Sequence, residues 1–273
     1  MDTLSAGDTS ASTLDRPSGA PTRERDDVFD APEDGRADHL GVRLGPRHPA
    51  LTGSAIAVIG LVMLGAIVIG LGLLLTDVLM PGAIGRWDAG VSDWFVARRT
   101  PALDTATRYG SDAGATLTIV GIALISSIAL GIARRWRAIQ FLVTALVLEV
   151  TVFLVAAMVV DRPRPDVTRL DVSPPTASYP SGHTAAAIVL YVAIAIIVSS
   201  LTVSRVLRLL AWAAALALPV IVAVSRLYRG MHHLTDVLAS VVLAGGALLI
   251  SMLAVRVGSA AAGDRPVERA RTS

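Results

Sequence analysis

A histidine and an aspartate four residues apart are the first side chains in this sequence whose types and spacing could do chemistry. They are His232 and Asp236, in the stretch SRLYRGMHHLTD at 225–236. If a helix covers this stretch, the two side chains share one face, a single turn apart. The carboxylate would then fix the tautomer of the imidazole and make the ring a better nucleophile or base. Arg226 adds a planar guanidinium that suits an oxyanion, whereas His233 points about 100° away and is interpreted as an ordinary interfacial residue.

A second histidine stands at the start of an apolar run, in the motif PSGHT at 180–184. The proline and the glycine shape a turn, and Ser181 is predicted to cap the helix that follows. Free amides and the positive end of the helix dipole make such a terminus an anion site. We therefore expect Ser181 and Gly182 to contact phosphate, with His183 beside it. A plain helix cap with a spare histidine remains the alternative interpretation.

Two arginines alternate with prolines in the stretch DRPRPD at 161–166. Proline stiffens the backbone and removes amide donors, so these arginines are held at a rigid site. Rigid guanidinium groups near a helix N-terminus favour phosphate binding. We assign phosphate contact to Arg164. Arg162 is interpreted first as a charged flank where a span leaves the membrane, and phosphate contact is its second interpretation.

These residues together provide an anion cradle, two histidines and an acid. The chain has no cysteine, no glycine-rich nucleotide loop and no carboxylate cluster suited to magnesium, so neither a metal nor another cofactor is expected. The parts support phosphoryl transfer through a histidine nucleophile. In this hypothesis His232 attacks phosphorus, and His183 protonates the departing oxygen. Water then hydrolyses the phosphohistidine, with His183 acting as the base.

The composition indicates a membrane protein. Of the 273 residues, 53% are hydrophobic and 17% are charged, and the mean hydropathy is +0.62. The formal net charge of +2 implies no strongly charged partner, and no nucleic acid is expected to bind. The chain contains no lysine, so arginine supplies every side chain of fixed positive charge. This arginine-only, alanine-rich composition favours a bacterial origin.

Six runs are apolar enough to cross a bilayer, which needs about 20 residues per helix. The six predicted spans cover residues 51–75, 115–133, 138–160, 184–203, 209–224 and 234–257. The predicted fold is therefore an all-α bundle of six transmembrane helices at 51–257. Residues 1–50 are polar and are predicted to be a disordered cytoplasmic tail, and 258–273 are predicted to be a second cytoplasmic tail.

Arginine placement predicts the orientation in the membrane, because cytoplasmic loops are enriched in arginine. Arginines flank the short loops after the second and fourth spans, at Arg134, Arg135, Arg137, Arg205 and Arg208. Six spans then put both termini in the cytoplasm and the loops 161–183 and 225–236 on the extracytoplasmic face. The segment 77–114 shares that face. Its Trp87 and Trp94 predict an amphipathic helix along the membrane surface.

The order of these motifs resembles that of the type-2 phosphatidic acid phosphatase (PAP2) superfamily of membrane-bound, metal-independent lipid phosphatases. The family's Pro-Ser-Gly-His motif is complete at 180–183, and its third motif is complete as Ser225, Arg226, His232 and Asp236. The resemblance implies a six-helix bundle with its active site near the outer membrane edge. It also implies a phosphorylated or pyrophosphorylated lipid as substrate, such as phosphatidic acid, phosphatidylglycerol phosphate or a polyprenyl diphosphate.

The family's first motif, a lysine followed after six residues by Arg-Pro, is incomplete here. Counting back from Arg164 places the lysine at Ala157, and counting back from Arg162 places it at Val155. In the family this lysine contacts the phosphate. The resemblance therefore leaves the phosphate site one cation short, and we hypothesise that Arg162 compensates.

Three other functions were weighed against a lipid phosphatase. A phosphotransferase would use the same phosphohistidine and deliver the phosphate to a lipid or sugar hydroxyl. A non-catalytic lipid-binding or transport relative would account for the missing lysine, but it has no need of His183, His232 and Asp236 together. A vanadate-dependent haloperoxidase shares the motifs, but six spans in a short chain argue against it. We therefore predict an enzyme that hydrolyses lipid phosphates in the cell membrane, and the sequence assigns no oligomeric state.

Overall fold

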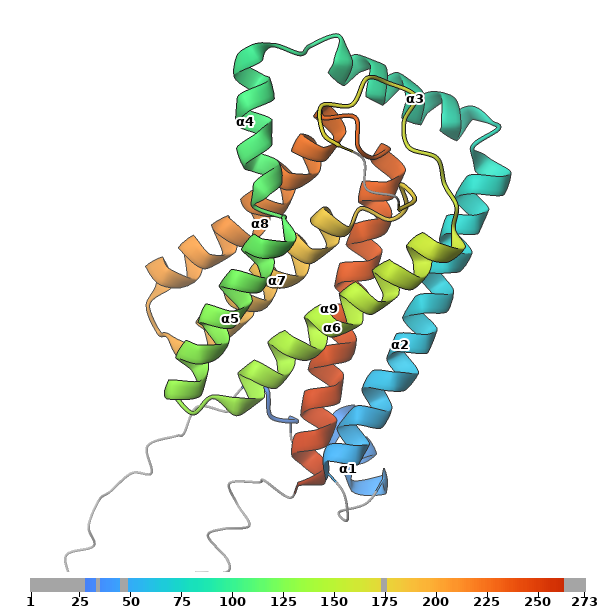
Figure 1. The fold of residues 1–273 in the computed structure, drawn as a ribbon. Coiled ribbons are helices and arrows are strands. Elements are labelled where there is room, and N and C mark those ends of the chain that lie inside the picture. The colour runs from blue at the N-terminus through green and yellow to red at the C-terminus, as the bar shows by residue number, and fades with distance from the viewer. Residues whose placement is uncertain (1–27, 33–34, 45–48, 173–175, 263–273) are drawn as a thin grey trace, which may run out of the picture.

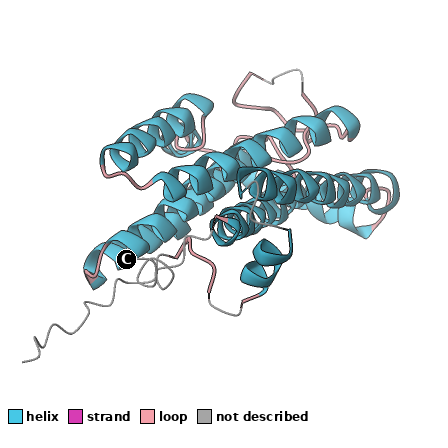
Figure 2. Cartoon of the chain, turned by 90° about the horizontal axis from the view of Figure 1, so that it is seen from below, coloured by secondary structure: helices cyan, strands magenta, loops and turns pink. Residues whose placement is uncertain are grey.

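The computed structural model describes residues 28–32, 35–44, 49–172 and 176–262, and these residues form helices and loops without a strand (Figures 1 and 2). The helices in chain order are α1 (Arg36–Leu44), α2 (Pro49–Leu73), the π-helical segment η1 (Leu74–Leu79), α3 (Ala83–Val96), α4 (Pro101–Asp112), α5 (Thr116–Ile132), α6 (Trp136–Val159), α7 (Gly182–Leu201), α8 (Arg205–Tyr228) and α9 (Leu234–Ala261). The all-α prediction is confirmed for this part of the chain.

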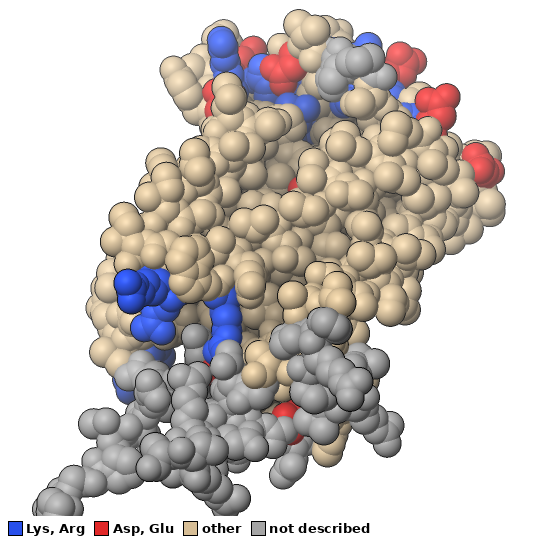
Figure 3. All heavy atoms as spheres, turned by 60° about the horizontal axis from the view of Figure 1, so that its bottom comes forward, with Lys and Arg blue, Asp and Glu red and all other residues tan. Residues whose placement is uncertain are grey.

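Five of these helices are long and apolar enough to cross a membrane. They are α2 with η1, α6, α7, α8 and α9. Helices α4 and α5 meet the same criteria only as a pair, with a bend of 42° between them. Figure 3 shows a broad belt without charged side chains between two ends where charges gather. The protein therefore has the features of a membrane protein with five candidate spans, or six if the bent pair forms one.

The bend between α4 and α5 is fixed by contacts with α7. A Cβ atom on Gly114 would lie 2.8 Å from the backbone oxygen of His183, so only glycine allows this close approach. The hydroxyl of Tyr191 donates to the backbone oxygen of Ala113, at 2.9 Å. Helix α5 has 17 residues and lies within one residue of the span expected at 115–133 at each end. The turn thus brings α4 and α5 together against the start of α7.

Helix α8 is longer than the span expected at 209–224. Ser204 caps its first turn by accepting a hydrogen bond from the amide of Leu207, at 3.4 Å. The helix then continues through Pro219 to Tyr228, and Arg226 lies in its last turn. The apolar run in the sequence marks only the middle of the helix. Arginine has a high helix propensity although it is not apolar, so the helix extends beyond this run. Arg226 is therefore carried on a helix instead of a loop.

Part of the segment expected to be a disordered tail is helical. Helix α1 packs on α9, where a Cβ atom on Gly41 would lie 2.6 Å from the Cβ atom of Ala260. Phe29 is 1% exposed, and its ring centroid lies 5.5 Å from that of Phe141 on α6. Of the tails expected at 1–50 and 258–273, residues 258–261 belong to α9, and 1–27 and 263–273 lie outside the described residues.

Helix α9 is the centre of the bundle and contacts α2, α6 and α7. Small residues let α2 approach it closely. A Cβ atom on Gly60 would lie 2.3 Å from the Ile250 side chain, and one on Gly246 would lie 2.4 Å from the Leu64 side chain. Such close approach is typical of helices packed in a membrane. The N-terminus of α9, which carries Asp236, is therefore anchored by a rigid core.

Helix α3 lies across the end of the bundle where α9 begins, and α4 runs from the corner along the side of the bundle, packed on α8 (Figure 1). The sequence predicted one surface helix in this segment, but the chain turns at the corner near Arg99. The guanidinium of Arg99 donates to the backbone oxygens of Tyr228, at 3.1 and 2.9 Å, and of Thr168, at 2.6 Å. The hydroxyl of Tyr228 donates to Asp104 on α4, at 2.8 Å. These bonds tie the corner to the C-terminal end of α8 and to the α6–α7 loop.

Candidate functional site

The loops before α7 and α9 meet at the end of the bundle below α3 (Figure 1). His232 is 4% exposed, and its Nδ1 atom lies 2.7 Å from the backbone oxygen of Ser178. A carbonyl oxygen can only accept a hydrogen bond, so Nδ1 carries the proton and Nε2 keeps its lone pair. The ring of His232 is therefore held in the tautomer that can act as a nucleophile through Nε2.

Asp236 reaches His232 through intermediates instead of directly. Its Oδ2 atom lies 3.9 Å from Nδ1 of His232, which is beyond a hydrogen bond. The same oxygen accepts from the hydroxyl of Ser178, at 2.5 Å, and from the amide of His233, at 2.8 Å. Asp236 thus holds Ser178, whose carbonyl oxygen accepts from the His232 ring, and His233, which follows His232 in the chain. Its geometry is that of a positioning residue.

Arg162 lies between two buried acids. Its Nη1 atom donates to Asp236, at 2.5 Å, and its Nη2 atom donates to Asp88 of α3, at 2.8 Å. All three side chains are fully buried. Asp88 also accepts from the amide of Thr235, at 3.1 Å, and from the Thr235 hydroxyl. The structure therefore commits both Nη groups of Arg162 to an ion-pair network of buried acids.

Arg164 and Arg226 keep donors free for a ligand. Arg164 donates through Nη1 to the backbone oxygen of Met231, at 2.6 Å, and its Nη2 atom makes longer bonds to the backbone oxygens of Thr176 and Ala177, at 3.3 and 3.4 Å. Arg226 donates through Nη1 to the hydroxyl of Ser111 on α4, at 3.0 Å, and the same atom lies 3.4 Å from Asp171. The Nε atoms of both arginines, like that of Arg162, are buried and have no partner among the described residues. Buried N–H groups of this kind are costly unless something accepts from them, so an anion would satisfy them.

The start of α7 differs from the capping expected of Ser181. Ser181 occupies the N-cap position, but its hydroxyl pairs with that of Thr184, at 3.0 Å. Gly182 is set by close packing, since a Cβ atom there would lie 2.9 Å from the ring of Phe153. His183 is partly exposed. The first amides of a helix have no partners within it, so this terminus still offers donors to an anion.

The surroundings of His232 favour its neutral form. Burial lowers the pKa of His232 well below 6.5, and the positive charges of Arg226 and Arg164 lower it further, although the hydrogen bond to Ser178 acts in the opposite direction. Burial likewise lowers the pKa of Arg164. A neutral imidazole among guanidinium groups is suited to attack a bound anion, because its lone pair stays available.

Acidification is expected to destabilise the folded protein through His232. The unfolded chain takes up a proton on this residue near pH 6.5, whereas the folded protein keeps the ring neutral to lower pH. The stability contributed by the neutral ring is therefore complete above about pH 6.5 and is lost as the pH falls below that value. The apparent unfolding temperature in detergent should fall less steeply with acidification in His232→Gln than in the wild type. Equal slopes would contradict this assignment.

Several residues of this end of the bundle were not singled out in the sequence. They are Asp88, Ser111, Asp171, Ser178 and Arg229. Arg229 follows Arg226 by three residues, so helical spacing could have indicated that they share a face. A single acid on an amphipathic helix, such as Asp88, is usually a solvated side chain, and no local sequence pattern indicates that Asp88 is buried.

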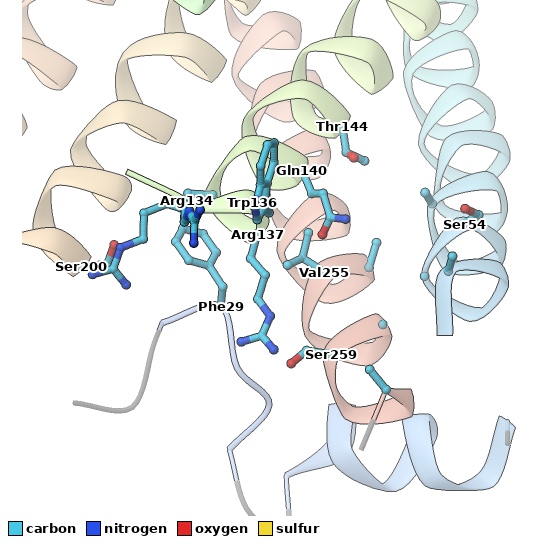
Figure 4. Close-up of a pocket in the computed structure, with 18 of the residues that line it drawn as sticks. Phe29, Ser54, Arg134, Trp136, Arg137, Gln140, Thr144, Ser200, Val255 and Ser259 are labelled. Atoms are coloured by element: carbon cyan, nitrogen blue, oxygen red, sulfur yellow. The ribbon is translucent and has the colours of Figure 1, made fainter. Parts of the chain in front are cut away.

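A cavity of about 720 Å³ lies at the opposite end of the bundle (Figure 4). It is lined by residues of α2, α6 and α9, including Ser54, Gln140 and Ser259, and by Arg134 and Trp136 near the α5–α6 turn. None of the residues around His232 lines it. The chemistry assigned to the histidines therefore does not involve this cavity.

Comparison with known proteins identifies relatives of the chain. The PAP2 superfamily model matches residues 137–258. A PAP2-type phosphatidylglycerolphosphate phosphatase from Bacillus subtilis is 22% identical, with a TM-score of 0.58 over 73% of this chain and 94% of that one. LpxE from Aquifex aeolicus is 20% identical, with a TM-score of 0.45 over 61% of this chain and 93% of that one. No curated protein gives a significant sequence match. The likeness to the Bacillus protein is one of fold, and the part of the chain that the PAP2 superfamily model matches contains His183, His232 and Asp236.

Proposed function

We propose that the protein is a phosphatase that hydrolyses lipid phosphates or diphosphates through a phosphohistidine on His232. The observation that carries the proposal is the hydrogen bond from Nδ1 of His232 to Ser178, at 2.7 Å, which leaves Nε2 as a nucleophile. Burial and nearby arginines keep the ring neutral. The match to the PAP2 superfamily and the phosphatase fold of the Bacillus protein support the same reaction class.

The reaction takes place in two transfers. The Nε2 lone pair of His232 forms a bond to phosphorus as the bond from phosphorus to the lipid oxygen breaks, and His183 gives that oxygen a proton. Water then attacks the phosphohistidine, with His183 taking a proton from the water and the P–N bond returning its electrons to His232. The products are the lipid alcohol and phosphate, or a lipid monophosphate and phosphate from a diphosphate.

Two arginines and a helix terminus would hold the phosphoryl group. The transition state spreads negative charge over three equatorial oxygens, which need donors fixed in advance. Arg164 and Arg226 would supply guanidinium donors, and the backbone around Ser181 and Gly182 would supply amides at the start of α7. Asp236 would keep its positioning role through Ser178. Arg162 would act behind this site, through Asp236.

The position of the site in the membrane follows from counting α4 and α5 as one bent span. Six spans at 51–257 would put α1 and the end of α9 in the cytoplasm, and α3 with the two histidines at the extracytoplasmic edge. The uncharged belt between the two ends supports access from the bilayer. A substrate with acyl or prenyl chains would then present its phosphate at the level of His232.

Phosphate release from lipid phosphates is expected to survive EDTA and to be inhibited by orthovanadate. The donors assigned to phosphate are arginines and amides, and vanadate resembles the transition state of phosphoryl transfer. The test uses purified protein in detergent with phosphatidic acid, phosphatidylglycerol phosphate and a polyprenyl diphosphate. Loss of activity in EDTA that magnesium restores would contradict the proposal. Transfer of labelled phosphate to an added alcohol, without free phosphate, would identify a phosphotransferase.

A further inference from the structure

The phosphate ligand Arg226 has a carboxylate of the protein itself beside it. Asp171, in the α6–α7 loop, lies with Oδ2 3.4 Å from Nη1 of Arg226. The Arg229 guanidinium holds the same carboxylate at two points, with Nη2–Oδ1 at 2.5 Å and Nε–Oδ2 at 2.7 Å. One acid from the loop therefore joins two arginines at the end of α8.

A carboxylate in this position has the charge and geometry that arginine recognises in a phosphate. Burial opposes ionisation of Asp171, but the hydrogen bond and charge of Arg229, followed by the charges of Arg226 and His183, lower its pKa. The side chain is therefore an anion at neutral pH. Its contact with Arg226 places it beside a group assigned to phosphate. A phosphate on Arg226 and a carboxylate within 3.4 Å of the same guanidinium would repel each other.

The contact between Asp171 and Arg226 can open, because Asp171 is the more exposed partner. The side chain of Asp171 is 29% exposed, whereas those of Arg226 and Arg229 are 6% exposed. The arginines are thus fixed in the bundle, and the acid lies nearer to solvent on a loop. An incoming phosphate would replace Asp171 as the anion beside Arg226, and the contacts of Asp171 with Arg229 oppose this displacement.

We propose that Asp171 occupies part of the phosphate site on Arg226 and competes with the substrate, so that phosphate binds only when this carboxylate moves away. The inference rests on the proposed function only in taking Arg226 as a phosphate ligand. A site whose competent state is one tenth populated binds its ligand about tenfold more weakly than an open site. Asp171 would therefore set the apparent affinity for phosphate without taking part in the chemistry.

The test compares Asp171→Asn and Asp171→Ala with Asp166→Asn. Asp166 is an exposed acid in the same loop and makes no ion pair with the described residues, so its replacement removes the same charge without opening Arg226. Binding of inorganic phosphate is measured from the phosphate-dependent rise in unfolding temperature, which requires no turnover. Both Asp171 variants should bind phosphate about tenfold more tightly than the wild type, and Asp166→Asn should match the wild type.

Turnover provides the second measurement. In the Asp171 variants the KM for the lipid phosphate should fall by a similar factor, while kcat stays close to that of the wild type. If Asp171 instead orients Arg226, phosphate binding will weaken in both variants, and the inference is wrong. Unchanged binding, binding in none of the proteins, or failure of both variants to fold would also overturn it. Tighter phosphate binding in a protein that hydrolyses no lipid phosphate would support the inference and contradict the proposed function.

Discussion

Replacing His232 with alanine is expected to abolish phosphate release, lowering turnover by about 10⁴-fold or more. The reason is that Nε2 of His232 has a free lone pair, since Nδ1 is held by the Ser178 carbonyl. His183→Ala should slow turnover by about 10²–10⁴-fold, because in the proposed mechanism His183 transfers only protons. The measurements are phosphate release and the amount of phosphoenzyme trapped from a radiolabelled lipid phosphate. His232→Ala should trap none.

The neighbouring His233 provides a matched control. It is also buried, but its Nε2 lies 3.3 Å from the backbone oxygen of Pro163, and it forms the N-cap of α9. Asparagine is among the best N-cap residues, so His233→Asn should fold and keep most of its turnover. Near-normal turnover in His232→Ala would exclude the phosphohistidine mechanism. Equal losses of turnover in His232→Ala and His233→Asn would show that both histidines affect turnover only by stabilising the fold.

Replacing Arg162 with alanine is expected to destabilise the protein by about 3–5 kcal/mol, because it leaves buried acids without their partner. Arg162 donates to Asp88 and to Asp236, and the side chains of all three are fully buried. Activity should fall with stability, since Asp236 would lose its hold on Ser178. The unfolding temperature and the phosphate release of the purified variant are the measurements.

The double variant Arg162→Ala with Ala157→Lys tests whether Arg162 replaces the lysine of the family motif. The structure assigns Arg162 to acids, so the added lysine should restore neither stability nor turnover. Arg169→Ala is the control, because Arg169 is an exposed arginine of the same loop. A stable Arg162→Ala protein with a raised KM that Ala157→Lys corrects would show that Arg162 is a phosphate ligand after all.

Much of the fold could be predicted from local patterns. Long apolar runs located α2, α6, α7 and α9 to within a few residues, because a helix in a membrane must satisfy its own backbone. The predictions were weaker where helix ends depend on neighbours. Helix α8 begins after a serine cap and includes arginines outside the apolar run, so apolarity alone did not predict where it begins and ends. The break between α4 and α5 follows from packing of Gly114 on α7.

The motifs determined by themselves which loops could carry chemistry, and alternation of spans predicted that the two loops would meet. They do meet, through the bond between His232 and Ser178. The spacing of His232 and Asp236 suggested direct contact, but only the folded structure showed that Ser178 lies between them. A spacing of four residues places two side chains on the same face of a helix. Whether they bond to each other depends on whether a third group lies closer to one of them.

Only the tertiary structure decided how the charges pair. Arg162 bonds to Asp88 and Asp236, each 74 residues away in the chain, and Asp171 reaches Arg226 from 55 residues away. The sequence by itself predicted a helical membrane protein in which two loops that carry histidine and arginine lie at the same end. It could not assign partners among those charges, because hydrophobic periodicity is a local signal. Ion pairing instead depends on distances that exist only after α3, the α6–α7 loop and the ends of α8 and α9 have packed together.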